Sequence, residues 1–517
     1  MNLGAFLSRN AIKYPDKVCL IEVGGKKRLT YGEFNERVNR LANGLRRLGL
    51  KKGNSVGLYL TNRIEWPEIY YGLAKLGAPV VSINFNMKDE ELLYVVKHSG
   101  LSLLFIDEGL QRNIIPLLAR IKEVRCVLLG NEEAPWRMRY EDIFDPSDPG
   151  EPGVPVNESD IHSICYTSGT TGFPKGAELT HENLIFGHYY QMTSEYGFSP
   201  NDTFLITTPS ANRVAWGRLA SAISLGATAC IMKKFSVKEA METIEKERVT
   251  VVTMVPTIAR MILQVPNPGD YDTSSLRIFL LTGEAFPLET QVKLRERFPH
   301  VGMISFYSST ETGAVSGLGP DDIFEKPNSA GRPIAGVEVR IVDESDQEVP
   351  PGEAGEILMR CGKPGRFLVM KRYHKNPSAT RKAFLGDWFR TGDIGRFDND
   401  GYLYIVDRKR DMIISGGYNI YGREVEKVIG DHPMVKEAAV VGVPDRDFGE
   451  AVMAFVVLAD GRRTAGTDAV KEEIIELCKE RMSGYKKPKY IEFIDALPRN
   501  QMGKVTKYVL RQRGTPS

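Results

Sequence analysis

The chain has 517 residues, of which 42% are hydrophobic and 26% are charged, and its formal net charge is +2. This composition is ordinary for a soluble globular protein, and the length is too great for one core, so we expect two or more domains. The near-neutral charge gives no reason to expect a nucleic acid or an anionic membrane as partner.

The six cysteines are scattered, and none lies in a Cys-x-x-Cys pair, so neither a zinc site nor a disulfide framework is expected. The first residues lack the long apolar stretch of a secretory signal. No apolar run approaches the ~20 residues that span a bilayer. These features predict a reduced, cytoplasmic enzyme without a transmembrane segment, and they leave its oligomeric state unknown.

The first third of the chain alternates between helices and short apolar strands. Thr30 and Glu33 have the spacing of a capping box, an apolar stripe follows as far as Leu48, and Gly49 is placed to end that helix. The pattern continues with strands at 56–60, 79–84 and 101–107, and with helices at 65–76 and 90–98. This alternation predicts an α/β fold with helix-covered, mainly parallel sheets.

Two later apolar runs, 249–255 and 278–281, each lead directly into polar or special residues. In open α/β sheets, ligands bind at the carboxyl ends of the strands. We therefore expect Pro256, the segment 282–285 and a loop at Tyr307 to converge on one site.

The segment 166–176 reads Tyr-Thr-Ser-Gly-Thr-Thr-Gly-Phe-Pro-Lys-Gly and follows a short apolar strand. Its glycines allow bare backbone to approach a ligand, and successive N–H groups with Ser/Thr hydroxyls form an anion-binding nest. Lys175 adds a positive charge, and Pro174 stiffens the approach to it. The segment predicts a phosphate-binding loop; the alternative is an ordinary surface linker. Because Gly176 follows the lysine, it is not the common Gly-Lys-Ser/Thr nucleotide loop.

The spacing of residues 168–176 resembles the Ser-Gly-Thr-Thr-Gly-x-Pro-Lys-Gly signature of the adenylate-forming superfamily, which contains acyl-CoA synthetases, luciferases and peptide-synthetase adenylation domains. Further matches are Tyr307–Glu311 with the Tyr-Gly-x-Thr-Glu motif, residues 391–393 with Thr-Gly-Asp, and residues 498–504 with Pro-x-x-x-x-Gly-Lys. The aspartate of the second match, Asp393, is expected on a turn, where it can accept both ribose hydroxyls. One departure is Ser308, which stands where glycine is usual.

The resemblance implies a large N-terminal domain, 1–407, and a small mobile α+β domain, 408–517, with a hinge near 407–411 at Arg410. Within this superfamily, the chain most resembles an AMP-forming acyl-CoA synthetase, which joins a small carboxylic acid to CoA through an acyl-AMP intermediate. In such enzymes the small domain rotates between the two steps, so that one site serves both.

The resemblance also implies the site residues. Lys504, Glu311 and Thr170 are the expected catalytic residues, and Glu311 and Thr170 are the expected ligands of Mg²⁺. The residues expected to bind ATP and CoA are Thr167, Ser168, Gly169, Thr170, Thr171, Gly172, Lys175, Gly283, Glu284, Ala285, Tyr307, Thr310, Asp393, Arg408, Gly416 and Gly417. The residues expected to line the acyl pocket are Asn212, Arg213, Trp216 and Gly217.

Three alternatives remain open at this point. An adenylation enzyme that activates amino acids normally has an aspartate after the first pocket strand, whereas this chain has Ala211 and Asn212 there, with Arg213 and Arg218 nearby. A luciferase-like oxygenase shares the same motifs, and a non-catalytic nucleotide-binding protein would have no use for Lys504. The acid itself, whether fatty, aromatic, alicyclic, dicarboxylic or betaine, is not indicated. The segments 362–365 and 373–380 resemble carnitine/crotonobetaine-CoA ligases but lie outside the expected acyl pocket.

Overall fold

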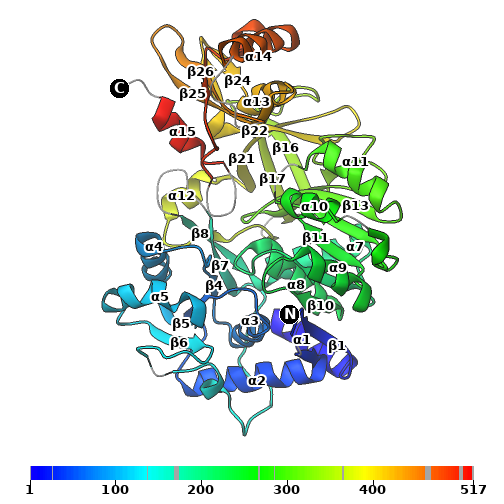
Figure 1. Cartoon of the computed structure of the whole chain (residues 1–517). Helices are drawn as coiled ribbons and strands as arrows, with labels where there is room; N and C mark the ends of the chain where they lie inside the picture. Colours follow the sequence, from blue (N-terminus) through cyan, green and yellow to red (C-terminus); the bar gives the residue numbers. More distant parts are fainter. Residues whose placement is uncertain are drawn as a thin grey trace. The chain divides into compact units, whose positions relative to one another are not determined.

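The computed structural model describes residues 2–25, 27–136, 138–167, 174–265, 268–283, 286–363, 366–459, 467–499 and 505–514. The chain divides into two compact units. The larger comprises Met1–Val339 and Met359–Phe389, and the smaller comprises Arg340–Leu358 and Arg390–Ser517. The α/β class with a large N-terminal and a smaller C-terminal part is thereby confirmed (Figure 1).

The first sheet of the larger unit has the order β19-β8-β7-β4-β3-β5-β6. Its strands are β3 (Ser55–Tyr59), β4 (Val80–Ser82), β5 (Leu101–Asp107), β6 (Arg125–Leu129), β7 (Ile161–Thr167), β8 (Lys175–Thr180) and β19 (Arg372–Tyr373). The strands β7, β4, β3, β5 and β6 are parallel, and β8 pairs antiparallel with β7 and β19. The predicted phosphate loop therefore connects two adjacent antiparallel strands, β7 and β8.

The second sheet has the order β15-β14-β13-β12-β11-β9-β10-β1-β2. Its strands are β1 (Val18–Glu22), β2 (Arg28–Thr30), β9 (Thr203–Ile206), β10 (Thr228–Ile231), β11 (Val251–Met254), β12 (Ile278–Leu281), β13 (Gly302–Ser309), β14 (Gly313–Leu318) and β15 (Arg332–Pro333). The central run from β13 to β1 is parallel, and antiparallel strands close both edges.

Helices cover these sheets as the sequence predicts. They are α1 (Leu3–Lys13), α2 (Tyr31–Arg47), α3 (Glu65–Leu76), α4 (Asp89–Ser99), α5 (Gln111–Ile114), α6 (His181–Ile185), α7 (Gln191–Tyr196), α8 (Arg213–Leu225), α9 (Val237–Lys246), α10 (Pro256–Leu263), α11 (Leu288–Arg297) and α12 (Pro377–Lys382). The capping box of α2 is present, with the Glu33 N–H donating to Thr30 Oγ1 at 3.2 Å and the Thr30 N–H donating to Glu33 Oε2 at 2.8 Å. None of the described helices is long and apolar enough to cross a bilayer.

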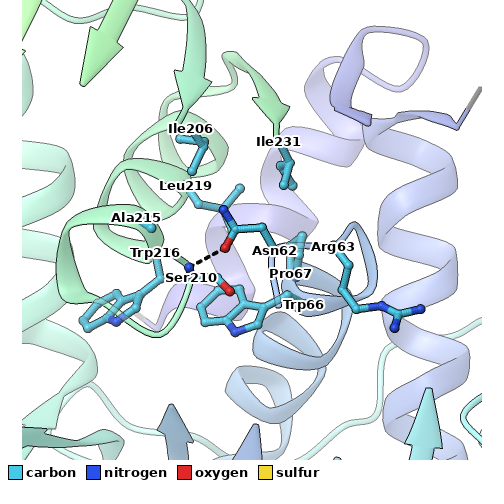
Figure 2. Close-up of a pocket in the computed structure, with 10 residues that line it drawn as sticks. All are labelled: Asn62, Arg63, Trp66, Pro67, Ile206, Ser210, Ala215, Trp216, Leu219 and Ile231. Atoms are coloured by element: carbon cyan, nitrogen blue, oxygen red, sulfur yellow. Dashed lines mark hydrogen bonds between the residues drawn. The ribbon is translucent and has the colours of Figure 1, made fainter. Parts of the chain in front are cut away.

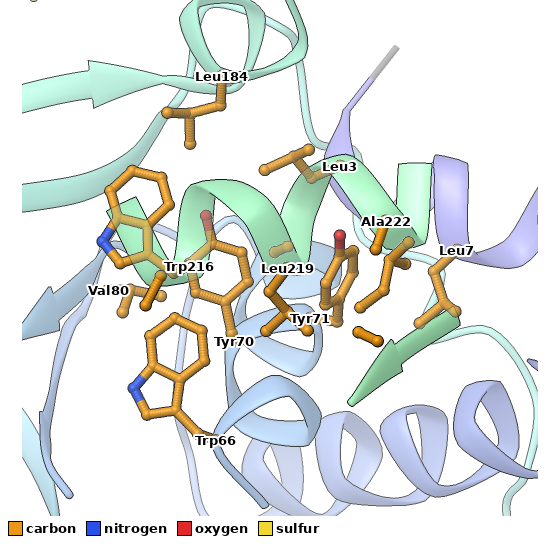
Figure 3. Close-up of a cluster of buried hydrophobic side chains, with 14 of the residues drawn as sticks. Leu3, Leu7, Trp66, Tyr70, Tyr71, Val80, Leu184, Trp216, Leu219 and Ala222 are labelled. Atoms are coloured by element: carbon orange, nitrogen blue, oxygen red, sulfur yellow. The ribbon is translucent and has the colours of Figure 1, made fainter. Parts of the chain in front are cut away.

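The core of the larger unit is built where α1, α3 and α8 meet. Figure 3 shows large side chains of these helices packed together, with Trp66 and Tyr70 of α3 beside Trp216 of α8. The rings of Trp66 and Tyr70 stack with their centroids 4.9 Å apart, and Tyr70 lies 5.9 Å from Trp216. Each fully buried large apolar side chain of this kind contributes ~1.5–3 kcal/mol. This packing holds α8 in place, and with it the polar residues that the helix carries.

A six-stranded sheet has the order β16-β17-β21-β20, with β18 paired to β17 and β22 to β21. Its strands are β16 (Val337–Val342), β17 (Gly355–Lys363), β18 (Arg366–Phe367), β20 (Phe384–Leu385), β21 (Trp388–Phe397) and β22 (Leu403–Arg408). The last sheet, of order β24-β23-β26-β25 with β27 on β26, has antiparallel pairs except for parallel β26 and β27. Its elements are β23 (Ile413–Ser415), β24 (Tyr418–Ile420), β25 (Val435–Asp445), β26 (Gly449–Leu458), β27 (Tyr490–Phe493), α13 (Gly422–Gly430), α14 (Thr467–Arg481) and α15 (Lys507–Gly514).

Two local expectations were wrong. The residues at Tyr307 are not a loop, because β14 pairs antiparallel with β13 and extends that strand to Ser309, with a register shift between Tyr307 and Ser308. Asp393 is not on a turn, because it lies within β21 opposite Arg408 of β22. Ser308 is exposed and does not adopt a positive φ, so this position does not require the glycine of the motif.

Candidate active site

Glu311 lies at the tip of the hairpin between β13 and β14. The turn is held by its own side chains, since Ser309 Oγ and Thr312 Oγ1 are 3.0 Å apart and the Thr312 N–H donates to Ser309 Oγ at 3.1 Å. Arg213, the first residue of α8, donates from Nη1 to the carbonyl oxygens of Ser309, at 2.9 Å, and of Thr310. The start of α8 and the hairpin tip are therefore joined. The turn that carries Glu311 is held both by its own side chains and by Arg213.

Two hydroxyl groups meet at one oxygen of the Glu311 carboxylate. Thr167, the last residue of β7, donates to Oε1 at 3.3 Å, and Tyr373 of β19 donates to the same oxygen at 3.1 Å. The Nζ of Lys175, at the start of β8, lies 5.3 Å from the centre of the Tyr373 ring. The structure thus brings Thr167, Lys175 and Glu311 together, as the sequence motifs predict for a phosphate site.

Tyr373 is a residue that sequence reasoning missed as part of this site. Burial, and then the negative charge of Glu311, raise the pKa of the Tyr373 hydroxyl, so it stays protonated and donates. Its sequence neighbourhood gave no signal, because the contact depends on β19 pairing with β8, through Tyr373 and Ala177.

The ends of three parallel strands converge as expected. Leu281 of β12 is in register with Met254 of β11 and with Ser305 of β13, so Thr282 and Gly283 follow at the level of Phe306 and Tyr307. Gly283 has a φ of +96°, and a Cβ there would lie 3.0 Å from Val255 Cγ1. A side chain at Gly283 would therefore be both strained and crowded.

Several predicted site residues lie outside the described part of the chain, and their roles stay predictions. They are Ser168, Gly169, Thr170, Thr171, Gly172, Glu284, Ala285 and Lys504.

The four residues predicted for the acyl pocket have different surroundings. Asn212 is the N-cap of α8, and Arg213 binds the hairpin tip. A Cβ on Gly217 would lie 2.6 Å from Cε1 of His188, so glycine is needed there for packing against that ring. Trp216 lines a cavity of about 10 Å³ opposite Trp66, shown in Figure 2. That volume holds about one water molecule, so this cavity is not an acyl site.

In the smaller unit, the predicted ribose and phosphate residues contact each other. The Arg408 Nε lies 2.6 Å from Oδ1 of the buried Asp393, and the two residues are partners in the pairing of β21 with β22. The structure therefore brings these two predicted nucleotide contacts together on neighbouring strands.

The predicted hinge residue and glycine pair follow within the smaller unit. Arg410 lies in a 3₁₀ turn, Lys409–Asp411, where its Nε is 3.8 Å from Asp411 Oδ2. Gly416 and Gly417 form the two-residue turn between β23 and β24, with φ values of +57° and +83°. Two positive φ values are the requirement of a tight hairpin turn, so the pair has a structural role whatever passes beside it.

A carboxylate with two hydroxyl donors and a lysine lies beside a Ser/Thr/Gly-rich segment of the sequence that follows the parallel strand β7. This combination is typical of an enzyme that acts with a nucleotide. Comparison with known proteins agrees. The model of the AMP-binding enzyme family matches residues 7–374, and that of the AMP-binding enzyme C-terminal domain matches residues 424–504.

The chain is similar along its whole length to acid–CoA ligases. It is 33% identical to the long-chain-fatty-acid–CoA ligase of Mycobacterium tuberculosis, covering 99% of this chain and 98% of the relative. It is 35% identical to the feruloyl-CoA synthase of an Amycolatopsis species, covering 99% of both. The o-succinylbenzoate CoA synthetase of Bacillus subtilis, solved with its acyl-adenylate intermediate, superposes with a TM-score of 0.84 at 29% identity, covering 98% of this chain and 97% of that one.

The chain therefore belongs to the AMP-binding enzyme family. Within it, the chain is an AMP-forming acid–CoA ligase, which uses ATP to make an acyl-adenylate and then transfers the acyl group to CoA.

Proposed function

We propose that this ligase activates a small carboxylic acid with Glu311 as its magnesium ligand, the 168–175 segment as its phosphate loop and Lys504 as its adenylation lysine. The observation that carries the proposal is the meeting of Thr167 and Tyr373 at Glu311 Oε1. Both donors reach Oε1. The described residues therefore leave the second carboxylate oxygen, Oε2, available for a cation.

The residues present fit Mg²⁺. This cation takes oxygen ligands and is usually held by one or two carboxylates together with substrate phosphates and water. The described residues include no group of three or more His, Cys, Asp or Glu side chains that forms a complete metal cage, which agrees with a shared site of this kind. When bound, Mg²⁺ neutralises the charge of the ATP phosphates, and Thr170 is proposed as its second protein contact.

In the first step, a carboxylate oxygen of the acid attacks the α-phosphorus of ATP, and the bond to pyrophosphate breaks. The negative carboxylate must approach the negative phosphates of ATP. The contribution of the enzyme to this step is therefore mainly electrostatic stabilisation. Lys504 is placed by its motif to bridge the carboxylate and the α-phosphate. Lys175 and the N–H groups of the 168–175 segment hold the departing pyrophosphate end.

In the second step, the CoA sulfur attacks the acyl carbon of acyl-AMP, AMP leaves, and the thiol proton passes to solvent. Asp393 is proposed to accept the ribose hydroxyls of the nucleotide, with Arg408 beside it. Gly416 and Gly417 are proposed to border the path of the pantetheine arm. The boundary at 407/408 and the hinge at Arg410 are part of the same proposal, since they allow one site to serve both steps.

The test is to separate the half-reactions. Pyrophosphate release from ATP in the presence of acid but without CoA reports the first step, and thioester formation from supplied acyl-AMP reports the second. Substitution of Glu311 by Gln should weaken the Mg²⁺ dependence of the first step. A Mg²⁺ titration of that variant that overlays the native one would contradict the role of Glu311.

A further inference from the structure

Arg218, in the second turn of α8, is a buried cation for which the described residues provide no anionic partner. The side chain belongs to a residue that is 5% exposed, and its Nε has no hydrogen-bond partner among those residues. Its Nη1 donates to the sulfur of Met192 at 2.8 Å, and its guanidinium carbon lies 5.5 Å from the centre of the Phe306 ring. Within the described chain, no carboxylate lies within 4.0 Å of it.

Two more buried polar side chains interact electrostatically with this guanidinium, since its charge contributes to the pKa shifts of both. His188, in the π-helical turn Phe186–Tyr190, is 5% exposed, and neither ring nitrogen has a hydrogen-bond partner among the described residues. Tyr196, at the end of α7, is 9% exposed, and its hydroxyl likewise has no partner in the described part of the chain. Burial lowers the pKa of Arg218 to about 10 and lowers the pKa of His188 well below its usual value, so the imidazole is neutral.

A cluster of buried polar groups that lack hydrogen-bond partners destabilises the fold. Buried polar groups in native proteins are nearly always hydrogen-bonded, and a buried charge without a partner is more costly still. A sulfur atom and a ring face satisfy a guanidinium only in part. The three groups together therefore point to an occupant that accepts hydrogen bonds and carries negative charge.

The distance from the cluster to the hairpin tip that carries Glu311 is on the scale of a small acid substrate. Arg213 binds the hairpin tip that carries Glu311, and Arg218 lies farther along the same helix by about 7.5 Å of helix rise. On the facing strand β13, Phe306 precedes Ser309 by about 10 Å. Phe306 and its strand partner Gly317 are partly exposed, and so is Ala314, which pairs with Ser308 nearer the hairpin tip.

We propose that Arg218, with His188 and Tyr196, binds a second carboxylate of the acid substrate, so that this ligase prefers dicarboxylic acids. The inference rests on the proposed function, because it assumes that the reacting carboxylate is activated beside Glu311. The second carboxylate then lies about 7–10 Å away, on the scale of the helix and strand spacing. A betaine is a disfavoured substrate, since its fixed positive charge would be repelled by the positive charges of Arg213 and Arg218.

The test uses the full chain and matched pairs of acids. Straight-chain dicarboxylic acids of graded length are each compared with the monocarboxylic acid of the same carbon number, by pyrophosphate release without CoA. One dicarboxylic acid should exceed its partner in kcat/KM by about 30-fold or more, as expected for a buried charge pair. Arg218→Met should remove that preference by lowering the dicarboxylate rate alone, and Arg218→Lys should keep part of it.

Arg297→Met is the matched control. Arg297 of α11 also has a buried Nε with no hydrogen-bond partner among the described residues, and the side chain donates to the carbonyl oxygens of Leu263, at 3.1 Å, and Val265. This variant should leave the ratio between the two acids unchanged. If the native enzyme does not discriminate, or if Arg218→Met lowers both acids equally, the guanidinium is structural and the inference is wrong.

A binding measurement separates this inference from the proposed function. At least one dicarboxylic acid of the series should raise the Tm of the native protein and of Arg297→Met, and that acid should not raise the Tm of Arg218→Met. If no acid yields pyrophosphate, the proposed function fails, and the shift in Tm still decides whether Arg218 binds the second carboxylate. If Arg218→Met does not fold, the Arg218→Lys protein replaces it, and an unchanged preference and Tm shift in that protein would contradict the role proposed for the guanidinium.

Discussion

Replacing Tyr373 by Phe tests how Glu311 is oriented. The substitution removes only the hydroxyl, 3.1 Å from Glu311 Oε1, and keeps the ring that faces Lys175. A hydrogen bond to a charged group contributes ~1.5–3 kcal/mol, which is roughly a 10- to 150-fold change in an equilibrium constant. Because the Thr167 hydroxyl at 3.3 Å still holds Oε1, the lower end applies, and the Mg²⁺ midpoint should rise about tenfold, within the range for partners of metal ligands.

The assay is single-turnover pyrophosphate release at saturating ATP and acid, measured against free Mg²⁺. Tyr166→Phe is the matched control, since the Tyr166 hydroxyl lies 2.8 Å from His98 Nδ1 instead of contacting Glu311. Its midpoint should equal the native one. A Tyr373→Phe midpoint within about twofold of native, with Glu311→Gln clearly shifted, would show that Thr167 alone orients the carboxylate.

Three further predictions follow from named residues. Lys504→Ala should abolish acyl-AMP formation and leave thioester formation from supplied acyl-AMP largely intact; equal loss in both assays would indicate a structural role. Gly417→Leu should slow the thioester step and spare adenylation, whereas Gly417→Asn, which tolerates a φ of +83°, is the control for strain in the turn. Thr30→Ala should lower the free energy of unfolding by ~1 kcal/mol through loss of the α2 cap, measured by denaturant titration, without changing either half-reaction.

The helices and central strands followed from local patterns. The α2 cap and the α3 helix needed only the spacing of apolar and capping residues, because those signals act within a few residues of the chain. The strands β5 and β12 were likewise bounded by polar residues on both sides.

The errors arose where a distant segment decides the local structure. Tyr307 and Asp393 were expected outside strands, yet β14 and β22 supply partners that extend β13 and β21 through them. Tyr373 entered the site only through the pairing of β19 with β8, a contact between residues far apart in sequence. Motif spacing predicted Glu311 and Thr167 as site residues but carried no information on which hydroxyl groups would face the Glu311 carboxylate.

The bond from Arg213 to the hairpin tip has a consequence for redesign of this enzyme. The helix that we propose to contact the acid, α8, is the same helix whose first residue binds the carbonyl groups beside Glu311. Substitutions made at Arg213 to widen the range of acids would therefore release the hairpin as well, and would lower turnover for every acid alike. Libraries that keep Arg213 and vary positions deeper in α8 should change selectivity while preserving activity.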